Sequence, residues 1–395
     1  MAASISGAAR TCYPRAAVAR RGGRRCAVIR SSLATSSPAC KPLGMRIGRH
    51  WTEIQGARDW DGLLNPLDGS LRGELVRYGE FVRAAYASFD FDGGTPSYGS
   101  CRFPSSSLLR RSGLPETGYR VTRLLHAAST SAPSWLSCSS SYIGYVAVCD
   151  DEDEIERLGR RDVVIAFRGT ATCSEWVDNF KSTLTHLPPT TSQRSGEDDG
   201  EAPMVECGFW RLFTAPGKAH SSLQHQVRGE VQRIVSEYGS KGMPPLSITV
   251  TGHSLGAALA VLTAYEITTS SSMQGHGDDD DAPMVTAVSF GGPRVGNAAF
   301  RRRLEESGGK VLRVVNSNDI VTKVPGFPVD DCGAAREDAP AKRKPRLPRW
   351  LVSKLGWEYS DVGRELRLCS QDSTRNVVAS HDLDLYLKLV AACTD

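Results

Sequence analysis

One serine lies in a sequence context that suits nucleophilic catalysis. It is the centre of Gly252-His253-Ser254-Leu255-Gly256, which follows the strand-like residues 248–250 and precedes 257–262, a run of small and apolar residues that favours a helix. A G-x-S-x-G pattern between a strand and a helix is typical of a nucleophile elbow, a turn too sharp for side chains beside the serine. The helix N-terminus favours developing negative charge. The pattern therefore predicts Gly252 and Gly256 as the elbow and Ser254 as the nucleophile.

A serine nucleophile needs a general base, and the chain order in this kind of site is Ser, Asp, His. Two histidines follow Ser254. His276 lies in an acidic, glycine-rich stretch, whereas His381 follows the strand-like residues 376–378 and opens a predicted helix over 382–390. His381 is therefore expected to be the base. The alternative is a helix-start histidine with a purely local hydrogen bond.

The carboxylate that orients His381 is expected to be Asp319. This aspartate follows a predicted strand over 311–315, and the carboxyl ends of parallel strands are where such sheets carry catalytic groups. A turn-capping role beside two asparagines is the alternative. The later aspartates lack a preceding strand of comparable quality: Asp330, Asp331 and Asp361.

Two backbone N–H groups are predicted to bind the negative oxygen that forms during the reaction. Leu255 follows the nucleophile and supplies one of them. Phe167-Arg168-Gly169-Thr170 ends another strand-like run, so Thr170 offers the second together with a hydroxyl that steadies the loop. An ordinary strand-ending turn is the alternative for this segment. His253 is expected to pack or hydrogen-bond beside the elbow, because its side chain points away from the serine.

An apolar stripe follows the predicted oxyanion loop. Trp176, Phe180 and Leu184 are spaced four residues apart, with charged residues between them. This spacing predicts a short amphipathic helix, which is most often part of a core. Its place beside the oxyanion loop supports a second interpretation, a mobile lid that exposes apolar surface to lipid when it opens.

These groups need a scaffold that brings distant segments to one edge of a sheet. From residue 142 onward strand-like runs alternate with helical patterns, which predicts an α/β domain with a largely parallel sheet and helices on both faces. The predicted elements are a hairpin of 142–148 and 163–167 across a charged turn, strands at 246–250, 284–290 and 311–315, and helices at 71–89, 223–238, 297–306 and 382–390. Residues 51–68 are expected to be extended, and 95–130 show few periodic signals.

The beginning of the chain differs from the rest in charge. Residues 1–52 have ten basic and no acidic side chains, so they carry +10 while the remainder carries −6. An Arg-, Ser- and Ala-rich opening without acids is typical of an organelle transit peptide, with plastid as the first choice and mitochondrion as the alternative. We expect a cleaved, disordered leader over 1–50 and one folded domain over 51–395. A disordered basic tail is the other interpretation of the opening.

Composition argues against several other classes of protein. No run approaches the roughly 18 apolar residues of a membrane-spanning helix, so contact with a membrane is expected to be peripheral. Eleven cysteines without C-x-x-C pairs argue against a zinc site and a secreted disulfide framework. Because the basic balance belongs to the leader, nucleic acid is not an expected partner.

Several motifs occur in an order that resembles the class 3 lipases, the fungal triacylglycerol lipase-like branch of the α/β-hydrolases. They are residues 167–170 with Glu175-Trp176, the elbow with the residues up to 260, and residues 289–297. The resemblance implies an α/β-hydrolase fold with a short helical lid. It also implies no metal and no organic cofactor.

The amino-terminal motifs narrow the resemblance further. Trp51-Thr52-Glu53-Ile54-Gln55-Gly56, Asp59-Trp60-Asp61-Gly62-Leu63-Leu64 and Arg77-Tyr78-Gly79-Glu80-Phe81 are similar to the signature of the plant plastid phospholipase A1 group, which includes the jasmonate-forming acyl hydrolases. This resemblance implies release of the sn-1 acyl chain from phosphatidylcholine or galactolipids, sometimes from triacylglycerol. It maps the triad onto Ser254, Asp319 and His381 and the oxyanion donors onto Thr170 and Leu255.

Two features depart from that group. The chain has Tyr359-Ser360-Asp361-Val362-Gly363 where the group commonly has a histidine between Tyr and Val-Gly, and residues 334–349 are unusually basic. The preferred lipid therefore stays open. Two rival functions also stay open. One is an esterase, thioesterase or peptidase that uses the same triad, and the other is a non-catalytic lipid or hormone receptor on a hydrolase scaffold.

Overall fold

The computed structural model describes residues 46–128, 140–170, 183–188, 202–270, 282–325, 359–369 and 377–393. Most of the predicted leader lies outside the described residues, and so do Trp176 and Phe180 of the apolar stripe. The larger parts of the predicted surface loops around 190–203, 269–283 and 333–349 lie outside them as well.

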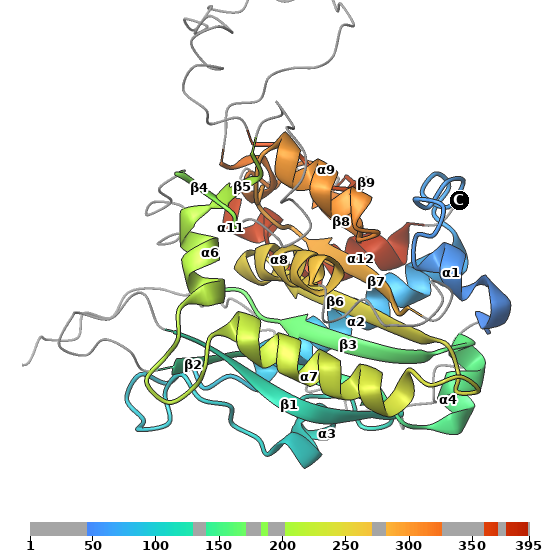
Figure 1. The fold of residues 1–395 in the computed structure, drawn as a ribbon, viewed down its shortest axis with the longest axis horizontal. Coiled ribbons are helices and arrows are strands. Elements are labelled where there is room, and N and C mark those ends of the chain that lie inside the picture. The colour runs from blue at the N-terminus through green and yellow to red at the C-terminus, as the bar shows by residue number, and fades with distance from the viewer. Residues whose placement is uncertain are drawn as a thin grey trace, which may run out of the picture. The chain divides into compact units, whose positions relative to one another are not determined.

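A seven-stranded sheet organises the described part of the chain (Figure 1). Its strands lie in the order β1, β2, β3, β6, β7, β8, β9; β1 to β3 are antiparallel, and all later neighbours are parallel. The bounds are β1 Tyr119–Ala128, β2 Ser140–Cys149, β3 Arg161–Phe167, β6 Leu246–His253, β7 Met284–Phe290, β8 Lys310–Asn316 and β9 Arg364–Leu368. β4 (Leu184–His186) and β5 (Met204–Glu206) form a separate antiparallel pair. The prediction of a mostly parallel central sheet is confirmed.

Helices cover both faces of this sheet (Figure 1). One core contains residues of α2 (Gly69–Ala87) and α12 (Leu383–Ala392), and the other contains residues of α6 (Cys207–Thr214), α7 (Leu223–Tyr238), α8 (Leu255–Thr269) and α9 (Ala298–Glu306). Helix α8 is buried on nearly every side, which suits its run of apolar residues. Shorter helical segments are α1 Trp51–Ile54, α3 Leu108–Arg111, α4 Glu152–Leu158 and α11 Val377–Ser380, with 3-10 turns η1 Gly48–His50, η2 Ser105–Ser107 and η5 Val321–Lys323.

Helix starts follow capping chemistry. Asp68, Ser222, Asn297 and Asp382 each accept a backbone N–H with the side chain at the start of α2, α7, α9 and α12. The bounds of α7 and β7 coincide with the predicted ranges. The apolar period was therefore readable in the sequence, whereas the caps are a finding of the structure.

Edge strand β1 was missed by the sequence analysis. Its register against β2 shifts between Val121 and Arg123 and again between Leu125 and His126, so its inward positions do not alternate strictly. The predicted extended lead-in at 51–68 is wrong, because that segment forms α1 and a series of turns around the buried Trp60. The Trp60 indole N–H donates to the Ile54 carbonyl at 2.8 Å, which closes this segment on itself.

Three further local predictions need correction. The charged turn between β2 and β3 contains α4, whose first turn is acidic and whose C-cap Gly159 is left-handed. Val377 and Val378 lie in α11 and not in a strand, because two β-branched residues are too short a signal against their tertiary setting. Leu184 belongs to β4, where it pairs with Glu206, so the predicted helical stripe does not extend to this residue.

Candidate active site

The turn between β6 and α8 is a strained elbow. Ser254 has φ 59° and ψ −126°, a conformation that residues other than glycine rarely adopt. A Cβ atom at Gly252 would lie 2.2 Å from the Gly256 carbonyl oxygen, and one at Gly256 would lie 2.6 Å from the carbonyl oxygens of Phe167 and Arg168. Close backbone packing therefore requires both glycines, which agrees with the interpretation of the G-x-S-x-G pattern.

The loop after β3 lies against this serine. A Cβ atom at Gly169 would lie 3.0 Å from the Cβ atom of Ser254, so the two residues are in direct contact. Thr170 follows Gly169, and its buried hydroxyl has no hydrogen-bond partner among the described residues. Leu255 begins α8 directly after the serine. Leu255 is thus adjacent to Ser254 in the chain, and Thr170 follows a residue that contacts Ser254.

His381 and Asp319 form a buried pair. His381 Nδ1 lies 2.6 Å from Asp319 Oδ2, and the two side chains are 1% and 0% exposed. Because a carboxylate only accepts hydrogen bonds, Nδ1 carries the hydrogen and Nε2 is left to take a proton. The second carboxylate oxygen accepts the Val321 backbone N–H at 2.9 Å. The rival Asp361 instead forms an ion pair with Arg294 at 3.0 Å.

Tyr386 of α12 is a member of this site that the sequence analysis did not identify. Its hydroxyl donates to Asp319 Oδ2 at 2.7 Å and accepts the Asn316 backbone N–H at 3.1 Å. Burial raises the pKa of Tyr386 well above its usual value, so the hydroxyl keeps its proton and remains a donor. Helical spacing marks Tyr386 as a core residue, but nothing in that spacing reveals the partner of its hydroxyl.

His253 connects the elbow to the backbone of His381. Burial, and then the nearby His381, lower the pKa of His253 to about 3, so its ring is neutral. Its Nε2 lies 2.8 Å from the His381 carbonyl oxygen, which only accepts, and therefore carries the hydrogen. Its Nδ1 then accepts the Tyr86 hydroxyl at 2.9 Å. The expected hydrogen-bonding role of His253 beside the elbow is confirmed, and Tyr86 is a partner that the sequence did not indicate.

The three predicted triad residues come together at the carboxyl edge of the sheet. Ser254 follows β6, Asp319 follows β8, and His381 lies in the turn between α11 and α12. The ring centroids of His253 and His381 are 4.7 Å apart, so His381 lies next to the elbow. Ser254 is 1% exposed, and its hydroxyl has no hydrogen-bond partner among the described residues. Catalytic hydrogen bonds often tighten only when substrate binds.

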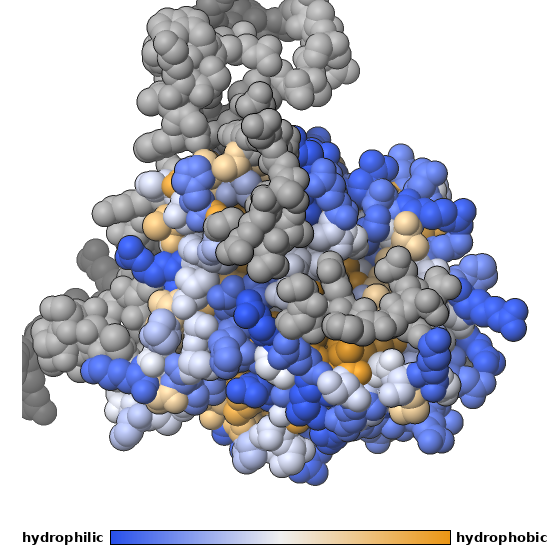
Figure 2. Space-filling model, in the orientation of Figure 1, coloured by the Kyte–Doolittle hydropathy of each residue, from blue (hydrophilic) through white to orange (hydrophobic). Residues whose placement is uncertain are grey.

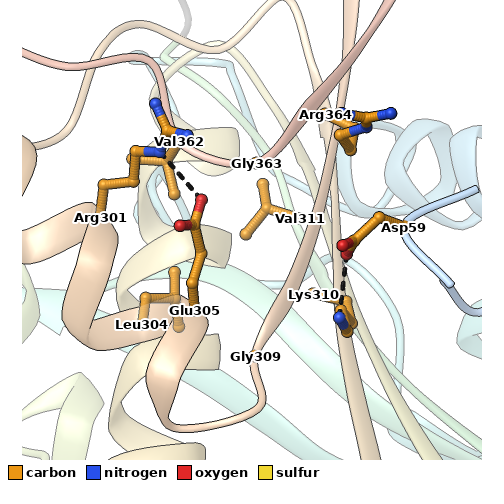
Figure 3. A pocket seen from close by; sticks show the side chains of 10 residues that line it. All are labelled: Asp59, Arg301, Leu304, Glu305, Gly309, Lys310, Val311, Val362, Gly363 and Arg364. Carbon is orange, nitrogen blue, oxygen red and sulfur yellow. Dashed lines mark hydrogen bonds and ion pairs between the residues drawn. The ribbon is translucent and has the colours of Figure 1, made fainter. Parts of the chain in front are cut away.

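A cavity of about 350 Å³ lies at the other edge of the sheet (Figure 3). Lys310 and Arg364, which begin β8 and β9, are among its lining residues. Four of its charged residues form ion pairs: Arg301 with Glu305 and Lys310 with Asp59, each at 2.9 Å. Because the predicted triad follows the carboxyl ends of the strands, this cavity does not contain the candidate active site.

Comparison with known proteins gives consistent matches. The family model described as Lipase (class 3) matches residues 164–329. A chloroplastic phospholipase A1 of Arabidopsis thaliana is 50% identical over 90% of this chain and 79% of its own length. A chloroplastic galactolipase of Arabidopsis thaliana is 38% identical over 87% of this chain and 70% of its own length. A chloroplastic/mitochondrial phospholipase A1 of Oryza sativa subsp. indica is 38% identical over 89% of this chain and 77% of its own length.

Proposed function

The chain belongs to the class 3 lipase family, a family of serine ester hydrolases, and from this premise we propose that Ser254, Asp319 and His381 are its catalytic triad. One observation carries the proposal. A buried histidine, held by an aspartate at 2.6 Å, lies at the same sheet edge as a serine in a strained elbow. Such a serine presents its hydroxyl above the sheet, and such a histidine has one nitrogen left to accept a proton.

The reaction follows from these roles. His381 Nε2 takes the proton of Ser254 as Oγ attacks the ester carbonyl, and the N–H groups of Thr170 and Leu255 hold the negative oxygen. Collapse of the tetrahedral intermediate breaks the C–O bond, and His381 returns the proton to the leaving alcohol. A water molecule, deprotonated by the same histidine, then attacks the acyl-enzyme and releases a carboxylic acid.

Glycerolipids are the proposed substrates. The relatives are named phospholipase A1 or galactolipase, which supports cleavage at the sn-1 position of a phospholipid or galactolipid. Among the described residues no helix is both long and apolar enough to cross a bilayer. We therefore propose that the enzyme contacts membrane lipids from the bilayer surface. Use of the released fatty acid for jasmonate or other oxylipin synthesis stays a prediction.

The test of the triad is Ser254→Ala in the purified full chain. Hydrolysis of a short-chain nitrophenyl ester is expected to fall by about 10⁴-fold or more, because the nucleophile is lost. A fluorophosphonate probe should label the wild-type protein and not this variant. Ser236→Ala, on the exposed face of α7, is the matched control and should behave as wild type. Turnover that survives in Ser254→Ala would refute the mechanism, and an unlabelled wild-type protein would favour the receptor function.

A plastid is the proposed location. The three relatives carry the word chloroplastic in their names, and one adds mitochondrial. The acid-free, basic opening of the chain supports a transit peptide over residues 1–50. A fusion of residues 1–50 to a fluorescent protein should enter plastids in plant cells. Its exclusive arrival in mitochondria, or its retention in the cytosol, would overturn this proposal.

A further inference from the structure

We propose that Phe91, Tyr98, Arg102 and Arg111 form a docking surface that seats the carboxyl edge of the sheet on a phospholipid bilayer. The inference rests on the proposed function, because a glycerolipid substrate must reach the site from a bilayer. Four observations lead to it: the place of this segment, the exposure of its aromatic rings, the order of its loop and the charge beside it.

The segment that follows α2 emerges at the candidate active site. Helix α2 ends at Ala87, one residue after Tyr86, whose hydroxyl contacts His253 of the elbow at 2.9 Å. Two residues later the Phe89 ring lies 3.6 Å under the guanidinium of Arg168. Arg168 donates to the Gly169 carbonyl at 2.7 Å. The docking surface is therefore connected through two contacts to the loop that carries Thr170.

Two aromatic rings at this place are exposed to solvent. Phe91 is 46% and Tyr98 58% exposed, while the Phe89 ring on which both rest is 3% exposed. The described part of the chain exposes two other large apolar side chains, Ile320 next to Asp319 and Met243. Three of these four thus lie at the carboxyl edge, on a molecule whose described surface in the view of Figure 2 is mainly hydrophilic. Phe91 and Tyr98 both pack on the Phe89 ring, and neighbouring exposed apolar side chains indicate an interaction site.

The loop that presents these rings is ordered by its own hydrogen bonds. The Asp90 carboxylate accepts the Asp92 backbone N–H at 3.1 Å and the Ser97 hydroxyl at 2.6 Å. Gly99 donates to the Asp90 carbonyl at 3.1 Å, and its own carbonyl accepts the Tyr142 N–H at 2.8 Å. The rings are therefore held outward before any contact forms, so little ordering is needed on binding. The Asp90 carboxylate therefore accepts hydrogen bonds from within the loop.

Two arginines give this surface a charge that complements lipid phosphates. Arg102 and Arg111 are exposed and lie over the Phe103 ring, at 5.6 and 4.3 Å from its centroid. Within the described ranges neither forms an ion pair with an acid, although Asp90 lies near Arg102. Aromatic rings favour the headgroup level of a bilayer, and guanidinium groups bind phosphate oxygens through paired N–H groups. A phospholipid surface offers partners for both kinds of side chain.

The experiment measures binding without turnover, in full-length protein that carries Ser254→Ala. Sedimentation with phosphatidylcholine vesicles should show a partition coefficient about tenfold lower for Phe91→Ala/Tyr98→Ala. Arg102→Gln/Arg111→Gln should lower it about threefold. Met243→Ala removes an exposed apolar side chain elsewhere on the surface and should bind like the parent. The basic leader is present in every variant, so its contribution cancels.

A second measurement separates docking from chemistry. In the active protein, Phe91→Ala/Tyr98→Ala should lower the ratio of vesicle hydrolysis to short-chain ester hydrolysis about tenfold, and Met243→Ala should keep it. Tyr98→Ser alone, a single exposed change, repeats the binding test if the double variant folds poorly, with a drop of about threefold expected. Vesicle binding of the aromatic variants equal to that of Met243→Ala would overturn the docking surface. Loss of the proposed function would appear differently, as wild-type protein that binds vesicles and hydrolyses neither substrate.

Discussion

The two edges of the parallel sheet differ in how completely their buried polar groups are paired. At the amino edge, Arg160 pairs with Glu74 at 3.1 Å and Arg77 with Asp162 at 3.1 Å, and all four side chains are at most 17% exposed. At the carboxyl edge, the hydroxyl of Ser254 is buried without a partner among the described residues, on a strained backbone. Breaking a buried charge pair strongly destabilises a fold. An unpaired buried hydroxyl on a strained backbone costs stability, and this cost is consistent with the proposed role of Ser254 as the nucleophile.

Helix α2 connects these two edges. Its first half supplies Glu74 and Tyr78 to the amino edge, and the Gln55 amide donates to the Tyr78 hydroxyl at 2.8 Å. Its last turn brings Tyr86 to the elbow. Midway, a Cβ atom at Gly79 would lie 2.1 Å from Leu387 Cδ2, so α2 and α12 approach closely. The amino-terminal motifs that resemble a lipase signature therefore contribute to the scaffold and, through α2, position the site.

Asp319→Asn is the sharpest test of the difference between the amino edge and the carboxyl edge of the sheet. The amide is nearly isosteric but offers N–H groups to His381 Nδ1, so the wrong ring tautomer is stabilised and kcat should fall by about 10³- to 10⁴-fold. Initial-rate assays with a soluble ester measure kcat. The midpoint temperature of thermal unfolding should stay within about 2 °C of the wild-type value. A kcat loss below tenfold would mean that this carboxylate does not orient the base.

Arg160→Met probes the amino edge with the opposite outcome. Removing one partner from a buried network leaves Glu74 and Asp162 with fewer cations, so the free energy of unfolding should fall by about 3 to 5 kcal/mol. Equilibrium unfolding in urea measures it, and kcat of the folded protein should stay within about twofold. Arg301→Met removes the exposed ion pair with Glu305 on α9 and should cost less than about 1 kcal/mol. Equal losses in both variants would show that burial of the network does not matter.

Acid should lower the free energy of unfolding through Glu74 at the amino edge and through His253 at the carboxyl edge, each over its own pH range. Burial alone would raise the pKa of Glu74, but Arg77 and then Arg160 outweigh it and lower the pKa from 4.5 to about 2. Its folded pKa lies below the unfolded one, so its contribution of about 3 kcal/mol is present above pH 4.5 and is lost as the pH falls toward 2. The pKa of His253 is lowered from 6.5 to about 3, so the unfolded state binds this proton first and stability decreases as the pH falls below 6.5.

Two variants separate these windows. His253→Gln should flatten the fall in unfolding free energy from pH 6.5 down to about 3, and it acts alone above pH 4.5, because glutamine does not titrate. Glu74→Gln should flatten the fall between pH 4.5 and 2 and leave the upper window unchanged. Urea unfolding at a series of pH values measures both curves. Identical slopes for wild type and both variants would show that other groups dominate acid unfolding.

Sequence reasoning identified the parts of the molecule in which local chemistry determines structure. The elbow glycines and the apolar period of α7 act over a few residues, so their pattern is visible in the sequence. Edge strand β1 was not found, because its bulges break the alternation that identifies a strand. Tyr86 and Tyr386 were missed for another reason. Their hydroxyl partners lie 167 and 67 residues away in the chain, and helical spacing carries no information about such contacts.

Tyr386→Phe should have the smallest effect and tests whether the carboxyl edge has a positioning residue beyond the triad. The hydroxyl donates at 2.7 Å to the same Asp319 oxygen that faces His381, and the ring is fully buried. Without this donor the carboxylate is less firmly held, so kcat/KM for a soluble ester should fall about tenfold. The acidic limb of the pH profile should also move to higher pH, because the carboxylate then has one hydrogen-bond donor fewer and attracts the protonated imidazole of His381 more strongly.

Tyr145→Phe is the matched control for that change. Tyr145 is equally buried, but its hydroxyl donates to the Phe81 carbonyl at 2.8 Å, away from the triad. Tyr145→Phe loses one buried hydrogen bond and Tyr386→Phe loses two, so the unfolding free energy should fall by about 1 and about 2 kcal/mol, respectively. Only Tyr386→Phe should shift the pH profile, because only its hydroxyl contacts the carboxylate that holds the base. A similar profile in both variants would limit Tyr386 to packing, and the two edges would then differ through Ser254, Asp319 and His381 alone.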